Sequence, residues 1–216
     1  EEASLKSAAA EIGRHGHRVD TLVGDVAIPD EATRVAEQAI REFGPIHILI
    51  NNVGGRRINI PTEDMPLAEW QRIMDLNLTS AFLCTKIVGG EMVKRRSGRI
   101  INTASICGLI ATRGIAGRSY ETAKAALCSF TRAVAADWAP HNVTVNAIAA
   151  GGFMTDPNRR WYEQIPHLKN TFESQVPMGR LGEPWEIGPL ALYLASDASS
   201  YMTGAVVVLD GGYTIW

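Results

Sequence analysis

The sequence predicts an α/β protein built on a doubly wound parallel β-sheet, and two observations support this. Short, almost wholly apolar runs, such as 46–50, 99–104 and 143–149, are typical of strands that are buried on both faces. Between them lie longer segments with apolar residues at three- and four-residue spacing, which is typical of amphipathic helices. Strands that alternate with helices favour parallel pairing through right-handed crossovers, with helices on both faces of the sheet.

The composition fits a single globular domain over residues 1–216. The chain has 216 residues, of which 46% are hydrophobic and 20% are charged, and its net charge is −2. Such a balance gives no reason to expect nucleic acid or a membrane surface as a partner, and no apolar run is long enough to span a bilayer. Cys84, Cys107 and Cys128 show no metal-binding spacing, so we expect free thiols in a reducing cytoplasm and no metal.

The first quarter of the chain alternates helix and strand. We expect a helix over 2–12, a strand over 17–26, a helix over 29–43 and a strand over 46–50. Pro29 opens the second helix, and Gly44 with Pro45 ends it. The strand over 46–50 leads into the turn-forming sequence Asn-Asn-Val-Gly-Gly, residues 51–55.

The rest of the chain repeats this alternation. We expect helices over 64–96, 118–138 and 182–194, and strands over 99–104, 143–149 and 205–209. Asn77 lies inside the first of these helices, where its amide competes for backbone groups, so we expect it to have a specific use. Residues 158–176 are polar and aromatic, and they form either a mobile cover or a packed helical excursion.

The stretch from Ser105 to Ala126 carries the clearest chemical signal. Ser105 ends a predicted strand, a loop with Gly108, Gly114 and Gly117 follows, and a helix rich in alanine carries Tyr120 and Lys124. Four residues are about one helical turn, so the phenol and the ammonium lie on one face. A neighbouring cation favours the phenolate, which suits the phenol to proton transfer. Taken alone, a Tyr and a Lys at this spacing more often form part of a solvated helix face.

This order of strand, Ser, glycine-containing loop and small-residue helix resembles the short-chain dehydrogenase/reductase family, over essentially the whole chain. The resemblance implies a Rossmann-like fold, NAD or NADP as cofactor, and a small alcohol or ketone as substrate. It implies that Tyr120 is the general acid/base, that Lys124 assists it and binds the nicotinamide ribose, and that Ser105 holds the substrate oxygen. Asn77 matches the family's asparagine at a helix kink, whose backbone holds a proton-relaying water.

The resemblance also implies which residues bind the cofactor. They are Asp25 and Val26 near the adenine, Asn51 and Gly54 near the adenosine ribose, Tyr120 and Lys124 at the nicotinamide ribose, and Gly151 and Thr155 near the carboxamide. Taken alone, Asp at a strand end is more often a turn or cap residue.

Several positions depart from the family pattern. The gap of 14 residues between Ser105 and Tyr120 is two longer than usual, so strict counting reaches Cys107; we prefer Ser105 because a loop absorbs an insertion easily. Val53 replaces an alanine at a place expected to be crowded, and Ala150 replaces a proline. Arg56 and Arg57 are either a solvated pair or a substrate or phosphate contact. By resemblance, residues 154–178 form a substrate lid.

The family's opening strand–helix–strand unit, ~30 residues or more, has no counterpart, so we expect an N-terminally incomplete sheet. That unit carries the glycine-rich turn that holds the pyrophosphate. Three arrangements are open for the gap: the unit is present in the gene product, residues 19–24 pair beside 46–50, or a partner chain fills the space.

Two functions follow from these observations. The leading one is an NAD(P)-dependent oxidoreductase that interconverts a secondary alcohol and a ketone, and residues 154–216 resemble gluconate and polyol dehydrogenases. The alternative is a catalytically silent, truncated member that retains only the fold and its assembly surfaces. The apolar C-terminal residues 213–216 are expected to pack on another subunit, in a homodimer or homotetramer.

Overall fold

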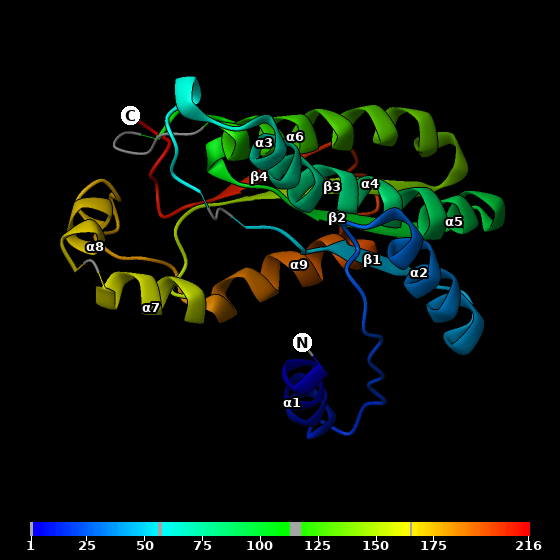
Figure 1. The fold of residues 1–216 in the computed structure, drawn as a ribbon. Coiled ribbons are helices and arrows are strands. Elements are labelled where there is room, and N and C mark those ends of the chain that lie inside the picture. The colour runs from blue at the N-terminus through cyan, green and yellow to red at the C-terminus, as the bar shows by residue number, and fades with distance from the viewer. Residues whose placement is uncertain (1, 56–57, 113–117, 165) are drawn as a thin grey trace.

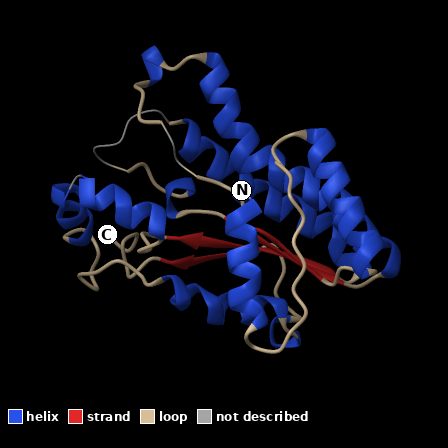
Figure 2. Ribbon diagram, turned by 60° about the horizontal axis from the view of Figure 1, so that its bottom comes forward, coloured by secondary structure: helices blue, strands red, loops and turns tan. Residues whose placement is uncertain are grey.

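A computed structural model describes residues 2–55, 58–112, 118–164 and 166–216, with only the backbone described at 166–168. Its centre is a four-stranded parallel sheet in the order β1-β2-β3-β4 (Figures 1 and 2). The strands are β1 (Ile48–Asn51), β2 (Gly98–Thr103), β3 (Val143–Ala150) and β4 (Val206–Leu209). These four agree with predicted strands to within about two residues, and their pairing is parallel as expected.

The helices predicted over 2–12, 29–43, 64–96 and 118–138 are confirmed, whereas the one predicted from 182 begins at Gly188, after a 3₁₀ segment over Pro184–Ile187. The helices of the described residues are α1 (Glu2–Gly13), α2 (Pro29–Phe43), α3 (Leu67–Met74), α4 (Ser80–Cys84), α5 (Gly90–Arg95), α6 (Ser119–Trp138), α7 (Asp156–Gln164), α8 (Pro166–Glu173) and α9 (Gly188–Ala195). Two π-helical segments, Asp75–Thr79 and Thr85–Gly89, join α3, α4 and α5 into the single helical stretch expected there. Within the described residues, no helix is both long and apolar enough to cross a membrane.

Helices cover both faces of the sheet. Alternate residues of β2 point to opposite faces, and the core divides accordingly. Ile100 packs in a cluster with Val88 and Met92 under the α3–α5 stretch, whereas Ile101 packs against Leu194 of α9 on the other side. Figure 1 shows α3 to α6 on one side of the strands and α9 on the other, and Ala36 of α2 belongs to the cluster on the α3–α6 side.

The predicted strand over 17–26 is wrong. Residues 17–25 form no strand, and the segment contacts α2 instead. Arg34 donates to the Val23 carbonyl, and the Arg18 Cζ atom lies 5.1 Å from the centre of the Phe43 ring. The alternative that residues 19–24 pair beside β1 is therefore also wrong. A strand forms only where a neighbouring backbone accepts its hydrogen bonds, and this segment lies beside a helix.

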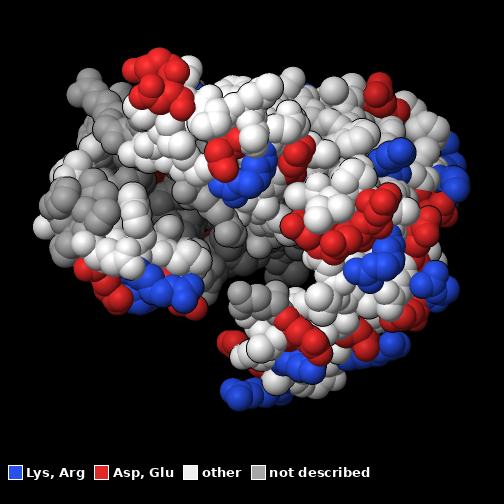
Figure 3. Space-filling model, viewed as in Figure 1, with Lys and Arg blue, Asp and Glu red and all other residues white. Residues whose placement is uncertain are grey.

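The outer edge of β1 is consequently open. Its described partner is β2 alone, and Ile48 and Ile50 are 44% and 49% exposed. In the space-filling view the molecule is hollowed between the α1 lobe and the main body (Figure 3). Val53, two residues beyond the end of β1, is 47% exposed, so the crowding expected at that position is not observed.

The C-terminal third ends in an aromatic contact. The Tyr213 ring stacks on Phe172 at 5.0 Å between centroids, and its hydroxyl donates to Gln175. This contact joins the chain end to the segment after β3, where the polar and aromatic residues form the two short helices α7 and α8 (Figure 1). The last two residues, Ile215 and Trp216, are largely exposed on the single chain.

Candidate active site

Tyr120 and Lys124 lie together on the first turns of α6. The Lys124 Nζ atom is 5.8 Å from the centre of the Tyr120 ring, so the predicted shared face is confirmed. Lys124 is 3% exposed, and its Nζ donates to the Thr103 carbonyl at 2.7 Å. Thr103 is the last residue of β2, so the end of the central strand holds the ammonium beside the phenol.

Burial changes the acidity of the lysine. It lowers the pKa of Lys124 to about 8 from an ordinary 10.5, because a charged ammonium loses its hydration there. The thiols of Cys128 and Cys107 oppose this shift. With a pKa of about 8, the group still carries its charge at neutral pH.

Ser105 follows β2 and begins the short 3₁₀ turn Ile106–Gly108. It is 7% exposed, and its Oγ accepts the Cys107 backbone N–H at 3.1 Å, which leaves the hydroxyl proton available to another acceptor. The turn packs directly on α6: a Cβ on Gly108 would lie 2.7 Å from the Lys124 carbonyl carbon. The thiol of Cys107 instead contacts the Thr112 hydroxyl at 3.3 Å.

Asn77 lies in the first π-helical segment and is fully buried. Its side chain exchanges two hydrogen bonds with the backbone of Gly55, at 2.9 and 3.0 Å, and also donates to the Ile73 carbonyl. The π-helical segment confirms the helical irregularity expected at Asn77. Turns of this kind often mark functional positions. A Cβ on Gly54 would lie 2.8 Å from Asn77 Oδ1 and 3.0 Å from Lys124 Nζ, so Asn77 and Lys124 face the same backbone.

Asn51 belongs to a buried polar chain that the sequence did not reveal. Its Nδ2 donates to the Thr85 hydroxyl at 3.0 Å and to Asn102 Oδ1 at 2.8 Å. Asn102 Nδ2 donates in turn to the Thr131 hydroxyl at 2.9 Å. The available signal was an Asn inside the apolar run 99–104 and a Thr on the buried face of α6.

The remaining residues predicted to bind cofactor lie at strand ends and turns. Gly151 follows β3, where a Cβ would lie 2.7 Å from the Asp210 Cα, and Thr155 accepts the Arg159 N–H just before α7. Asp25 is exposed and caps a turn by accepting the Ala27 N–H, and Val26 is half-buried beside it. No described contact joins Asp25 or Val26 to the lysine and tyrosine. Arg56, Arg57, Gly114 and Gly117 lie outside the described residues.

The nicotinamide end of a dinucleotide fits the residues present. An ammonium has three protons to donate, and within the described residues the Lys124 Nζ has one acceptor, the Thr103 carbonyl. The missing side chain of Gly54 lets the backbone approach this ammonium closely. For the pyrophosphate end, the sequence of 216 residues contains no G-x-x-x-G-x-G motif.

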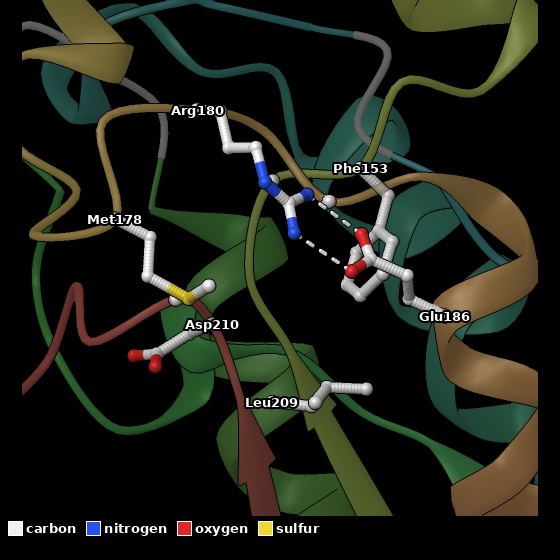
Figure 4. Close-up of a pocket in the computed structure, with 9 residues that line it drawn as sticks. Phe153, Met178, Arg180, Glu186, Leu209 and Asp210 are labelled. Atoms are coloured by element: carbon white, nitrogen blue, oxygen red, sulfur yellow. Dashed lines mark hydrogen bonds and ion pairs between the residues drawn. The ribbon is translucent and has the colours of Figure 1, made fainter.

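A separate cavity of about 80 Å³ lies beyond the carboxyl ends of β3 and β4 (Figure 4). Arg180 donates to both carboxylate oxygens of Glu186 at its rim, at 2.7 and 2.8 Å, and lowers the pKa of that carboxyl to about 2. The pair neutralises its own charge, and neither Tyr120 nor Lys124 lines the cavity. In the described part of the chain, no three His, Cys, Asp or Glu side chains are close enough to hold a metal ion.

Comparison with known proteins identifies the family. A family model described as enoyl-(acyl carrier protein) reductase matches residues 1–214. A galactitol 2-dehydrogenase (L-tagatose-forming) of Cereibacter sphaeroides is 39% identical over 218 aligned positions, covering 100% of this chain and 83% of that protein. The chain belongs to the short-chain dehydrogenase/reductase family. Its fold is accordingly the Rossmann-like α/β fold of this family, and the family uses NAD(P).

A further relative and two solved structures are also similar to the chain. A 3-oxoacyl-[acyl-carrier-protein] reductase of Synechocystis is 37% identical, covering 96% of this chain and 81% of that protein. The crystal structure of gox2181 superposes with a TM-score of 0.95 at 33% identity, over 100% of this chain and 84% of that one. A short-chain type dehydrogenase/reductase from Mycobacterium marinum gives 0.92 at 38% identity, over 99% and 83%.

Proposed function

We propose that the protein is an NAD(P)-dependent oxidoreductase that interconverts a secondary alcohol and a ketone, with Tyr120 as general acid/base. One observation carries the proposal: a buried ammonium, held at the end of β2, lies 5.8 Å from the centre of the Tyr120 ring. Family membership supplies the reaction class. The side-chain arrangement supports Tyr120, rather than any other group described here, as the proton carrier.

Each of four residues has its own role in the proposed reaction. In the oxidation direction, Tyr120 as phenolate accepts the hydroxyl proton of the alcohol, and in reduction the phenol returns it to the carbonyl oxygen. Lys124 stabilises the phenolate by its charge. Ser105, whose Oγ accepts the Cys107 N–H, donates a hydrogen bond from its hydroxyl to the substrate oxygen and keeps its proton. Asn77 holds the loop at Gly55 close to the lysine.

The nicotinamide dinucleotide, when bound, supplies the hydride acceptor or donor. Lys124 and Tyr120 would hold its nicotinamide ribose, and Gly151 and Thr155 would lie near the carboxamide. Asn51, Gly54, Asp25 and Val26 would line the adenosine half. The substrate would lie under the segment 154–178, which we propose as its lid.

A small, hydroxylated substrate is the class we propose. A galactitol 2-dehydrogenase of Rhizobium johnstonii is 36% identical to the chain, and an NAD-dependent glycerol dehydrogenase of Listeria innocua is 35% identical. Both names describe polyol oxidation, which removes hydride from a carbon that carries a hydroxyl. The 3-oxoacyl-[acyl-carrier-protein] reductases among the relatives make a 3-oxoacyl-[acyl-carrier-protein] the substrate class to compare.

Replacing Tyr120 with Phe tests the mechanism. We expect turnover of galactitol with NAD or NADP to fall about 10²- to 10⁴-fold, the usual contribution of a general acid/base. Tyr201→Phe is the matched control, because that side chain is fully exposed and the same hydroxyl is removed. Undiminished turnover in Tyr120→Phe would remove the assignment.

A second candidate is a catalytically silent chain that retains the fold alone. The open edge of β1 favours it, because Ile48 and Ile50 are exposed where an α/β sheet is normally covered. Titration with NADH and NADPH, followed by the fluorescence of the five tryptophans, separates the two. Saturable quenching at micromolar concentration supports the enzyme, and its absence supports the silent chain.

We further propose a homodimer or homotetramer in the cytoplasm. The exposed Ile215 and Trp216 at the chain end form an apolar surface that association would cover. The three cysteines are free, as expected in a reducing compartment. Sedimentation equilibrium of the chain and of its Trp216→Ser variant measures whether this surface contributes.

A further inference from the structure

We propose that Thr131 is a positioning residue for Lys124. Its hydroxyl ends a buried chain of hydrogen bonds that fixes α6 against β2, so that the lysine ammonium meets the Thr103 carbonyl. The inference deepens the proposed function and rests on it, because Lys124 matters to catalysis only if Tyr120 is the proton carrier.

The chain crosses four elements without interruption. It starts at Thr85 in the second π-helical segment, passes Asn51 at the end of β1 and Asn102 in β2, and ends at Thr131 in α6. The Thr131 hydroxyl donates to the Leu127 carbonyl at 2.8 Å, so its oxygen is the acceptor for Asn102. All four side chains are at most 8% exposed.

The geometry ties two successive residues of β2 to one face of α6. Asn102 binds Thr131 through its side chain, and Thr103 accepts the Lys124 ammonium through its carbonyl. Thr131 is seven residues beyond Lys124, about two helical turns, so both point from α6 to the same side. With two attachment points, α6 can neither rotate nor slide along β2 without breaking one of them.

Apolar packing alone would not fix this register. Methyl groups on α6 could exchange neighbours at little cost, whereas a buried amide that loses its acceptor has no water to replace it. In the native register both the oxygen and the nitrogen of the Asn102 amide have hydrogen-bond partners. The free-energy cost of burying this amide is therefore small in the native register and large in a shifted one.

Several groups lie around the Lys124 ammonium. Tyr120 and Cys128 lie one turn away on α6, Cys107 lies on the turn after β2, and Asn77 faces it from the π-helical segment. Burial is the dominant influence, and it lowers the pKa of Lys124 to about 8. The ammonium pKa therefore reports whether Lys124 remains in its dry position.

The test measures this pKa directly in the folded chain. Lysines labelled with ¹³C at Cε are titrated by NMR, and the Lys124 signal among the five lysines is assigned from its loss in Lys124→Arg. We expect Thr131→Val to raise the pKa of Lys124 by at least one pH unit toward 10.5, because a displaced helix admits water. Thr131→Ser, which retains the hydroxyl, should keep it at about 8.

Thr144→Val is the matched control. Thr144 is 7% exposed in β3, and its Oγ1 has no hydrogen-bond partner within the described residues, so the same substitution should leave the pKa of Lys124 unchanged. If Thr131→Val does not fold, the double variant Asn102→Leu/Thr131→Val removes both partners and leaves Asn51 bonded to Thr85. A Lys124 pKa that stays near 8 in a folded variant without the tether overturns the proposal.

This measurement needs no turnover. Loss of the proposed function would appear as undiminished activity in Tyr120→Phe, whereas loss of the tether would appear in the titration of Lys124 alone. In an active preparation, Thr131→Val should lower kcat, because a displaced Lys124 no longer stabilises the Tyr120 phenolate, and Thr131→Ser should restore kcat.

Discussion

Two neighbouring strands of the sheet expose the same type of side chain to very different extents. Ile50 of β1 and Ile101 of β2 are direct neighbours in register, yet Ile50 is 49% exposed and Ile101 is 1% exposed. Ile101 is covered by α9 through Leu194, whereas β1 has a described strand on one side only. Burial in this sheet therefore depends on neighbours far along the chain rather than on the apolar run itself.

The N-terminal segment extends the contrast to whole elements. The 20-residue helix α6 contributes eight buried residues to the core, whereas α1, with 12 residues, buries none. A short helix has little stability without packing, since most helical stability in proteins comes from an apolar face against the core. We therefore expect two regions of very different local stability in one chain.

Hydrogen exchange gives the largest expected difference between them. Amides of α1 should exchange within about tenfold of the unprotected rate, because the helix can open without opening the core. Amides of β2 and β3 should be limited by global unfolding, on the order of 5–15 kcal/mol for a domain. Peptide-level mass spectrometry measures both in one experiment. Protection of α1 close to that of α6 would contradict the division.

A pair of matched substitutions tests the contrast at the sheet itself. Ile101→Ala should lower the free energy of unfolding by about 2–5 kcal/mol, because it leaves a cavity in a packed core. Ile50→Ala removes the same atoms from a half-exposed site and should cost under about 1 kcal/mol. Urea denaturation compares the two. Equal losses would mean that the edge of β1 is covered in solution.

The same contrast explains which elements the sequence predicts. The helices α2 and α6 follow from their periodicity, and the strands β2 and β3 follow from their apolar runs, because the apolar residues of all four pack in the core. Residues 17–26 have a comparable pattern in Val19, Leu22 and Val23, but the structure places them along α2, and no described strand pairs with them. Strand formation is a property of pairs of segments, which a single segment cannot reveal.

The candidate site was predictable in part for a related reason. Tyr120 and Lys124 share one helix, so helical geometry alone predicts their proximity, and the structure confirms it. The hydrogen-bonded tether joins Asn51 to Asn102, which are 51 positions apart in sequence, and Asn102 to Thr131, which are 29 positions apart. Such contacts depend on strand register and helix placement, and they become visible only in three dimensions.

The buried lysine offers a smaller test of the well-packed half. Replacing Lys124 with Met removes an ammonium that burial destabilises, so the variant should be more stable at pH 7, by at most about 3 kcal/mol for a pKa of about 8 against 10.5. As the pH rises from about 8 to 10.5, Lys124 loses its proton in the folded chain before it does so in the unfolded chain. The wild type then gains stability with rising pH, and the advantage of Lys124→Met should shrink.

Urea denaturation of both proteins at pH 7, 9 and 10.5 measures the difference. Comparing the two proteins at each pH cancels the titration of distant groups, such as Cys84 and Tyr162, whose pKa values burial raises. A stability difference that stays constant across this range would show that Lys124 is solvated in the folded state.

The smallest expected effects come from two glycines that differ in their surroundings. A Cβ on Gly108 would lie 2.7 to 2.8 Å from backbone atoms of Lys124 and Ala125, so Gly108→Ala must displace the turn after Ser105 from α6. We expect a loss of about 1–3 kcal/mol. Gly90, at the start of α5, has nothing within 4 Å of the same position, so Gly90→Ala should stabilise the chain by about 0.5–1 kcal/mol.

Thermal unfolding of Gly108→Ala and Gly90→Ala shows the sign of each effect. Because the Gly108 turn also orients Ser105, Gly108→Ala should in addition lower turnover in an active preparation, whereas Gly90→Ala should not. A Gly108→Ala variant as stable as the wild type would mean that this turn does not pack on α6. The close approach of this turn to the lysine helix would then lose its structural basis.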